Sequence, residues 1–251
     1  MGFAATQRAR SRAGSQAAAP QVAGPRSTAQ PLRPLPAVSR TSTARAAPKP
    51  RGAAILRVRA GRSVALRSKP RGRVLARVGA RTQFGSPTTL TVAAQRGGWV
   101  GVTSTDLPNG RLGWLKATGA PVSRSHTRLA IRVDLSRRRL QLVDGRRVLR
   151  NATVGIGRPG SSTPTGRFAI TDKLSGSAYG PYYGCCILAL SGHQTNTPAG
   201  WRGGDRLAIH GTNDPGSIGV PSSAGCLHAR ARDLRVLLRR VPLGTPVLIR
   251  R

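Results

Sequence analysis

The chain has 251 residues, which is enough for one or two domains and too few for many. Its 42 lysines and arginines outnumber seven acidic residues, all of them aspartates, and the formal net charge is +35. This charge is spread as +9 over residues 1–51, +11 over 52–122 and +15 over 123–251, which predicts a general attraction to polyanions and argues against a dedicated nucleic-acid-binding surface.

Residues 1–51 are rich in Ala, Arg, Pro, Ser, Thr and Gln and have no hydrophobic period. Such a composition cannot bury enough apolar surface to offset the entropy lost on ordering, so we expect a disordered tail or linker. No apolar core of an export signal is visible in this segment. The sequence nowhere approaches the ~20 apolar residues of a membrane-spanning helix, so we expect no transmembrane segment.

Residues 52–122 contain short aliphatic and β-branched runs broken by Gly and Pro, a pattern typical of a small barrel of short strands. The run PTTLTVAAQRGGWVGVTSTDLPNGRLGWLKA resembles the bacterial SH3-like domain, in which a Gly-Trp pair recurs near the end. The resemblance implies a module that binds cell-wall peptides or acts as a spacer. We expect Trp99 and Trp114 to be core residues of this barrel.

Residues 127–251 begin as a β-meander. Alternating or aliphatic stretches predict strands at 129–135, 139–143 and 245–249. Asp144-Gly145 predicts a hairpin after the second of them. Leucines at helical spacing, with arginines between them, predict one helix over 229–240.

One histidine and one cysteine each lie in a glycine-flanked turn, His210 before Gly211 and Cys226 after Gly225, with fifteen residues between them. A thiol needs a base to become a nucleophile, and histidine supplies one near neutral pH. We therefore expect Cys226 to be a nucleophile and His210 its base. The helix predicted soon after Cys226 would lower the thiol pKa, and the N–H groups of Gly225 and Cys226 would hold an oxyanion. The Gly211 carbonyl is expected to orient the imidazole, with Asp214 as the alternative.

The other two cysteines, Cys185 and Cys186, are adjacent in sequence, and the odd total of three leaves at least one free thiol unless chains pair. Packing is the expected role of the adjacent pair, with a redox disulfide as the second interpretation. Zinc binding by cysteines together with His193 or His210 is a competing idea, although the spacing matches no common zinc site.

Residues 129–250 resemble an L,D-transpeptidase catalytic domain of the YkuD type. The segments that carry this resemblance are VDLSRRRLQLVDG, VGIGRPGSSTPTGRFAI, AYGPYY, LAIHGTNDPGSIG and SSAGCLHARARDLRVLLRRVPLGTPVLI. The resemblance implies a mainly β fold, with a β-sandwich-like catalytic domain that carries one short helix after the nucleophile. It also implies a cysteine acyl-enzyme that cross-links peptidoglycan stem peptides through two meso-diaminopimelate residues, with release of D-Ala and without a cofactor or metal.

By this resemblance Cys226 is the nucleophile, His210 the base and Gly211 the carbonyl that orients it. Ser223 carries over as the small residue of the family's Ser-His-Gly-Cys element. Tyr182 and Trp201 fall where the family has a lid over the substrate groove. A wall substrate implies an extracytoplasmic location, in the cell wall or periplasm, where anionic wall polymers are further partners.

Two positions depart from the family pattern: Ala224 replaces the histidine of Ser-His-Gly-Cys, and His228 stands where Arg or Asn is usual. These changes bear on a hydrogen bond near Cys226 and on a polar contact to a substrate carboxylate, which His228 could partly replace. They also favour an alternative function, a catalytically weak or inactive protein that binds peptidoglycan.

Overall fold

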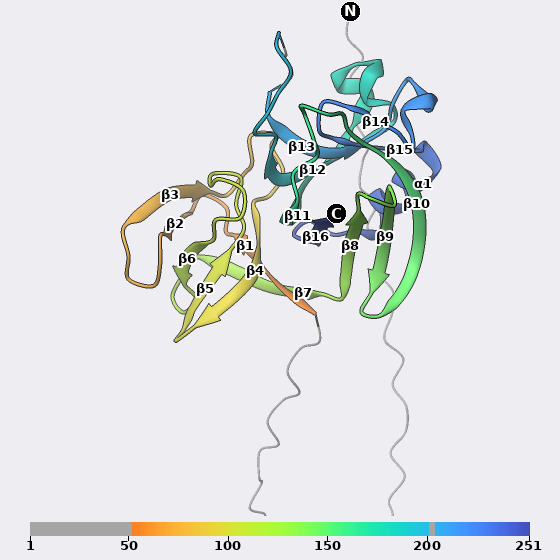
Figure 1. Ribbon diagram of the computed structural model, residues 1–251. Coiled ribbons are helices and arrows are strands. Elements are labelled where there is room, and N and C mark those ends of the chain that lie inside the picture. Colours follow the sequence, from red (N-terminus) through yellow and green to blue (C-terminus); the bar gives the residue numbers. More distant parts are fainter. Residues whose placement is uncertain (1–51, 201–203) are drawn as a thin grey trace, which may run out of the picture. The chain divides into compact units, whose positions relative to one another are not determined.

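The computed structural model describes residues 52–200 and 204–251, all within the compact unit Pro48–Arg251. The tail predicted over residues 1–51 and the predicted lid residue Trp201 lie outside the described residues. The described chain is mainly β, as predicted, and its strands form two sheets (Figure 1).

The first sheet has seven strands in the order β3-β2-β6-β5-β4-β1-β7. They are β1 Ala53–Val58, β2 Ser63–Arg67, β3 Val74–Gly79, β4 Thr89–Arg96, β5 Trp99–Val102, β6 Gly113–Lys116 and β7 Val122–Thr127. Apolar side chains of these strands enclose a core of their own, which includes Leu56, Leu66 and Leu90. Trp114 is buried, as predicted, whereas Trp99 is only half-buried. The SH3-like assignment and its boundaries remain predictions.

The second sheet is assembled from the strands after Arg128 and has the order β14-β10-β15-β13-β12-β11-β16-β8-β9. Its strands are β8 Leu129–Asp134, β9 Arg139–Asp144, β10 Arg147–Gly157, β11 Gly166–Ser175, β12 Cys186–His193, β13 Arg206–His210, β14 Pro221–Ser223, β15 Leu227–Ala229 and β16 Pro246–Arg250. The predicted hairpin is present: Gly145 has a φ of 60°, and Arg147 of β10 pairs with Asp144 of β9.

Two long strands close this second sheet on itself. In β10, residues 147–153 pair with β9, and residues 154–155 pair with β15. In β11, residues 166–169 pair with β16, and most of the remainder pairs with β12. Eight of the described strands therefore form a closed β-barrel around one core. The predicted β-sandwich-like arrangement, which would have two separate sheets, is not what the structure shows.

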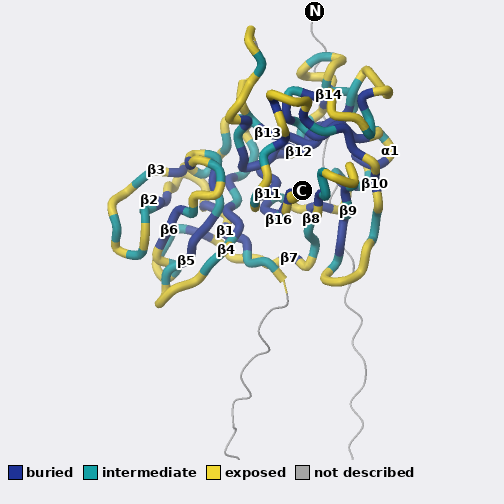
Figure 2. The backbone as a smooth tube through the Cα atoms, in the orientation of Figure 1, coloured by how far each residue is buried: buried dark blue, intermediate teal, exposed yellow. Residues whose placement is uncertain are grey.

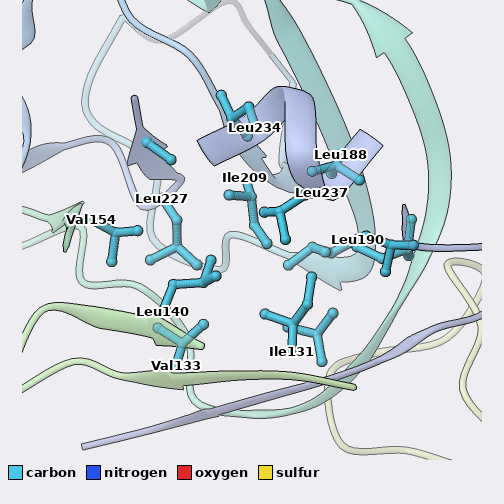
Figure 3. Close-up of a cluster of buried hydrophobic side chains, with 14 of the residues drawn as sticks. Ile131, Val133, Leu140, Val154, Leu188, Leu190, Ile209, Leu227, Leu234 and Leu237 are labelled. Carbon is cyan, nitrogen blue, oxygen red and sulfur yellow. The ribbon is translucent and has the colours of Figure 1, made fainter. Parts of the chain in front are cut away.

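The helix α1, Ala231–Arg240, covers one side of this core. Leu234 and Leu237 are fully buried in one cluster with Leu188, Ile209 and other strand residues (Figure 3). Figure 2 shows that β12 and β13 are buried over most of their length. Among the described residues, no helix is long and apolar enough to cross a membrane. The helix and the core thus fix the position of β13, which ends at His210, and of β15, which follows Cys226.

Candidate active site

The neighbouring parallel strands β13 and β15 bring the predicted base and nucleophile together. Ile209 pairs with Leu227, and both side chains lie in the core. Because side chains alternate across a strand, His210 and its register partner His228 point away from that core. Cys226 lies in the bend just before β15 and lines the same small cavity as His210. Strand pairing, rather than a sequence-local contact, brings the histidine and cysteine turns together.

His210 is held in one orientation by its own turn. Its Nδ1 lies 2.5 Å from the carbonyl oxygen of Gly211, and because a carbonyl only accepts, Nδ1 carries the proton. The hydrogen bond predicted for Gly211 is therefore present. Nε2 is left with its lone pair, buried and without a hydrogen-bond partner among the described residues. Asp214, the alternative orienting group, instead accepts from the backbone N–H of Gly216. A proton acceptor thus remains on His210.

The turn before Cys226 is built around Ser223. The Ser223 hydroxyl donates to the Cys226 carbonyl at 2.6 Å and accepts from the Gly225 N–H at 3.1 Å. Gly225 has a φ of 120°, which a residue with a side chain rarely adopts. The predicted oxyanion role of the Gly225 N–H is not supported, because Ser223 already occupies this donor. Ser223 and Gly225 instead shape the nucleophile turn.

The prediction that a helix N-terminus lowers the pKa of the Cys226 thiol is wrong. Strand β15 lies between Cys226 and α1, which begins only at Ala231, so the helix N-terminus does not follow the thiol directly. Burial raises the pKa of the Cys226 thiol to about 11, against a hydrogen bond from the backbone of Ala208 that lowers it. Burial also lowers the pKa of His210 to about 4, and the nearby His228 adds to this shift. The resting pair is therefore a neutral thiol and a neutral imidazole.

This charge state predicts a specific pH profile for acylation of Cys226. Neutral His210 is the required base, so the second-order rate should rise with pH through about 4 and then stay level across neutral pH. A preformed thiolate–imidazolium pair would instead lose activity as pH rises through a histidine pKa near or above 6.5. Stopped-flow acylation by a carbapenem between pH 3.5 and 9 measures the difference, and a falling alkaline limb near neutrality would contradict the neutral pair.

Two tyrosines cover the histidines. The ring of Tyr182 lies 5.5 Å from that of His210 and 5.9 Å from that of His228, and the ring of Tyr183 lies 4.9 Å from His210. Both tyrosines and Cys226 line a small cavity of about 40 Å³. Tyr182 thus lies against both histidines, and its role as a lid residue stays a prediction. Tyr183 was missed in the sequence, although it directly follows Tyr182 in the same Pro-Tyr-Tyr-Gly turn.

Cys185 and Cys186 form a disulfide, and Cys226 is the free cysteine. The adjacent pair is therefore disulfide-bonded, its redox role stays a prediction, and Cys186 also packs in the core, as first expected. The Cys186 carbonyl accepts from the Gly211 N–H at 3.0 Å, so the disulfide borders the turn that orients His210. The zinc alternative loses two of its sulfur ligands, and the described part of the chain holds no group of three metal-ligating side chains.

Gln194, which the sequence does not mark, ties the nucleophile turn to a neighbouring loop. Its buried side-chain amide lies 3.0 Å from the carbonyl of Ala224 and 3.1 Å from those of Ser161 and Ser162. The amide also fills the space in front of Gly225, where a Cβ would come within 1.8 Å of Nε2. Gln194 therefore holds the turn at the position where the family's histidine is replaced by Ala224.

Replacing Gln194 with methionine should destabilise the protein by about 1–3 kcal/mol, because buried carbonyls lose their donor. Gln194→Glu should cost more, since a carboxylate would face three carbonyl oxygens. Acylation of Cys226 should slow in both variants. Thermal unfolding and carbapenem acylation measure these effects, with the exposed Gln95→Met as the matched control. If Gln194→Met is as stable as the wild type, the hydrogen bonds of Gln194 do not hold the nucleophile turn in place.

The C-terminal half of the chain also matches a known family. The family model of the L,D-transpeptidase catalytic domain, YkuD, matches residues 128–249. This part of the chain is thus similar to a YkuD-type catalytic domain. Similarity reaches 33% identity over 121 residues with the YkuD protein of Bacillus licheniformis and 32% over 123 residues with that of Bacillus subtilis strain 168. The matches cover 47% and 48% of this chain and 64% and 65% of the relatives, just under two thirds of their length.

The solved structures that are similar to this chain are more distant in sequence. An L,D-transpeptidase from Mycobacterium smegmatis is 14% identical with a TM-score of 0.40, over 78% of this chain and 99% of that one. Bdellovibrio bacteriovorus Bd1075 is 22% identical with a TM-score of 0.39, over 49% of this chain and 48% of that one.

Proposed function

We propose that the chain is a peptidoglycan L,D-transpeptidase that works through a Cys226 acyl-enzyme. The observation that carries this proposal is that His210, fixed by Gly211, and the free Cys226 line one small cavity, while Nε2 of His210 has no hydrogen-bond partner among the described residues. A Cys/His pair with an oriented base is the arrangement that nucleophilic acyl transfer needs.

In the first half-reaction, Sγ of Cys226 attacks the carbonyl carbon of the donor stem peptide while Nε2 of His210 takes the thiol proton. The tetrahedral intermediate then collapses: the C–N bond to the terminal D-Ala breaks, and His210 returns the proton to the leaving nitrogen. A thioester remains. In the second half-reaction, an acceptor amine attacks the thioester carbon, the C–S bond breaks, and the proton passes through His210 to Sγ.

Mass spectrometry of the intact protein with a carbapenem tests the nucleophile. The wild type should gain one adduct that peptide mapping places on Cys226, and Cys226→Ala should gain none. Incubation with a purified disaccharide-tetrapeptide then distinguishes a cross-linked dimer from a hydrolysed tripeptide. If folded wild-type protein forms neither adduct nor product, the enzyme proposal fails and the alternative of a non-catalytic peptidoglycan-binding protein stands.

The peptidoglycan substrate and the net charge of +35 also lead us to propose an extracytoplasmic location with anionic wall polymers as partners. Binding to isolated walls should weaken as salt rises from 50 to 500 mM, because added ions screen exposed charges. Salt-independent binding would point to a specific peptide or glycan contact instead.

A further inference from the structure

His228 is a second imidazole at the site that the mechanism above does not use. It pairs in register with His210, and the two ring centroids lie 4.8 Å apart. His228 is 3% exposed and lies on β15, two residues after Cys226. Tyr182, whose exposed fraction is 36%, lies against both rings. Both imidazoles therefore lie beneath the same partly exposed tyrosine.

The hydrogen bonds of His228 determine which ring nitrogen carries its proton. Nδ1 lies 2.9 Å from the Ser217 hydroxyl, and this hydroxyl lies 2.6 Å from the carbonyl oxygen of Asp214. Because that carbonyl only accepts, Ser217 gives it the hydroxyl proton and must accept from Nδ1 of His228. Nε2 of His228 then has a lone pair, and it is buried with no hydrogen-bond partner in the described ranges. Both histidines thus present a basic Nε2.

Acyl transfer to an amine needs a place for two protons. The acceptor arrives as an ammonium ion and leaves as an amide nitrogen, so it loses two protons, of which the departing Sγ takes back only one. His210 holds one proton at a time. In the first half-reaction the leaving D-Ala amine needs an additional proton to become an ammonium ion. The cycle is balanced if a second group at the site accepts the extra proton in one half-reaction and supplies it in the other.

We propose that His228 is this second proton-transfer residue: its Nε2 removes the first proton from the incoming acceptor ammonium, directly or through one water, and later gives it to the departing D-Ala amine. The inference rests on the proposed transpeptidase function. His210 remains the partner of the thiol. The other titratable groups around His228 are Tyr182, which is in ring contact, and Asp214, whose charge acts on the imidazole.

The test variant is His228→Asn, whose side-chain amide can still donate to Ser217 but cannot accept a proton from an ammonium ion. Acylation by a carbapenem expels no free amine and should stay close to the wild-type rate. Transfer of the acyl group from a donor peptide to a D-amino acid at pH 7 should fall by about tenfold or more, towards the usual range for general bases. The loss should shrink as pH rises towards the pKa of the acceptor amine.

Hydroxylamine is the decisive acceptor, because it is largely unprotonated at pH 7 and needs no initial deprotonation. With a thioester donor, which expels no amine, transfer to hydroxylamine should be equally fast in wild type and His228→Asn, whereas transfer to a D-amino acid should remain slow in the variant. The exposed His126→Asn is the matched control, and His228→Gln replaces the Asn variant if circular dichroism shows that the latter is unfolded.

Three results would overturn the assignment: an undiminished D-amino acid transfer in the variant, an equal loss with both acceptors, or a loss of carbapenem acylation with the fold intact. The last two would show that His228 only positions its neighbours. Failure of the wild type to be acylated at all would instead overturn the proposed function, so the two failures are distinguishable.

Discussion

Replacing His210 with asparagine should slow acylation of Cys226 by about 10²–10⁴-fold, the usual contribution of a general base. The asparagine amide can still donate to the Gly211 carbonyl, so the turn keeps its hydrogen bond while the proton acceptor is lost. This loss corresponds to about 2.7–5.4 kcal/mol of transition-state stabilisation, at 1.36 kcal/mol per factor of ten. The second-order rate of carbapenem acylation, followed by stopped-flow, measures it.

The pH dependence of that loss distinguishes a missing base from a distorted site. The thiolate population of Cys226 grows as pH rises towards the thiol pKa of about 11, and a thiolate needs no base. The deficit of His210→Asn should therefore narrow as the solution becomes more alkaline. Hydroxylamine transfer should also be slow in this variant, unlike in His228→Asn. A variant that acylates at the wild-type rate at pH 7 would remove His210 from the mechanism.

Replacing Arg150 with leucine should destabilise the protein by about 3 kcal/mol. Arg150, on β10, contacts the carboxylate of Asp233 in the first turn of α1, with Nε at 2.7 Å and Nη2 at 2.5 Å. The Asp233 side chain is almost fully buried, so the variant leaves a buried carboxylate without its partner. Breaking a buried pair in this way costs about 3–5 kcal/mol, and the partial exposure of Arg150 places this case at the lower end.

Chemical denaturation measures this difference, with two controls. Arg146→Leu removes an exposed arginine from the adjacent hairpin and should change stability by no more than about 0.5 kcal/mol. The double variant Arg150→Leu/Asp233→Leu removes both charges and should recover most of the lost stability, because no buried ion remains. If the single and double variants are equally unstable, packing of the arginine stem rather than its charge holds α1 to β10.

Much of the second sheet could be predicted because its signals are local. Alternation over 129–135 and the Asp144-Gly145 turn correspond to β8, β9 and the start of β10. The helix was predicted within two residues of its observed start at Ala231. Strand β15 could not be predicted, because a buried strand of three residues is too short to show a hydrophobic period. Its omission is the reason that Cys226 was expected to adjoin the helix.

The site itself was only partly visible in the sequence. His210, Cys226 and Gly211 follow from residue chemistry and from the family motif. Gln194 depends on three carbonyls that come from two distant loops, so no local pattern marks it. The pKa shifts could not be foreseen either, because burial of the thiol and imidazole is a property of the folded strands and of the tyrosines above them.

The Cys185–Cys186 disulfide has a practical consequence for enzymology on this protein. Of its three cysteines, two are consumed by their own bond, so the oxidised chain offers a single thiol to an alkylating reagent. Stoichiometric labelling would then count active centres in a preparation without any cysteine having been removed by mutation. A fluorophore or isotope attached in this way would report from the reaction centre itself, and a second equivalent of label would signal that the adjacent pair has been reduced.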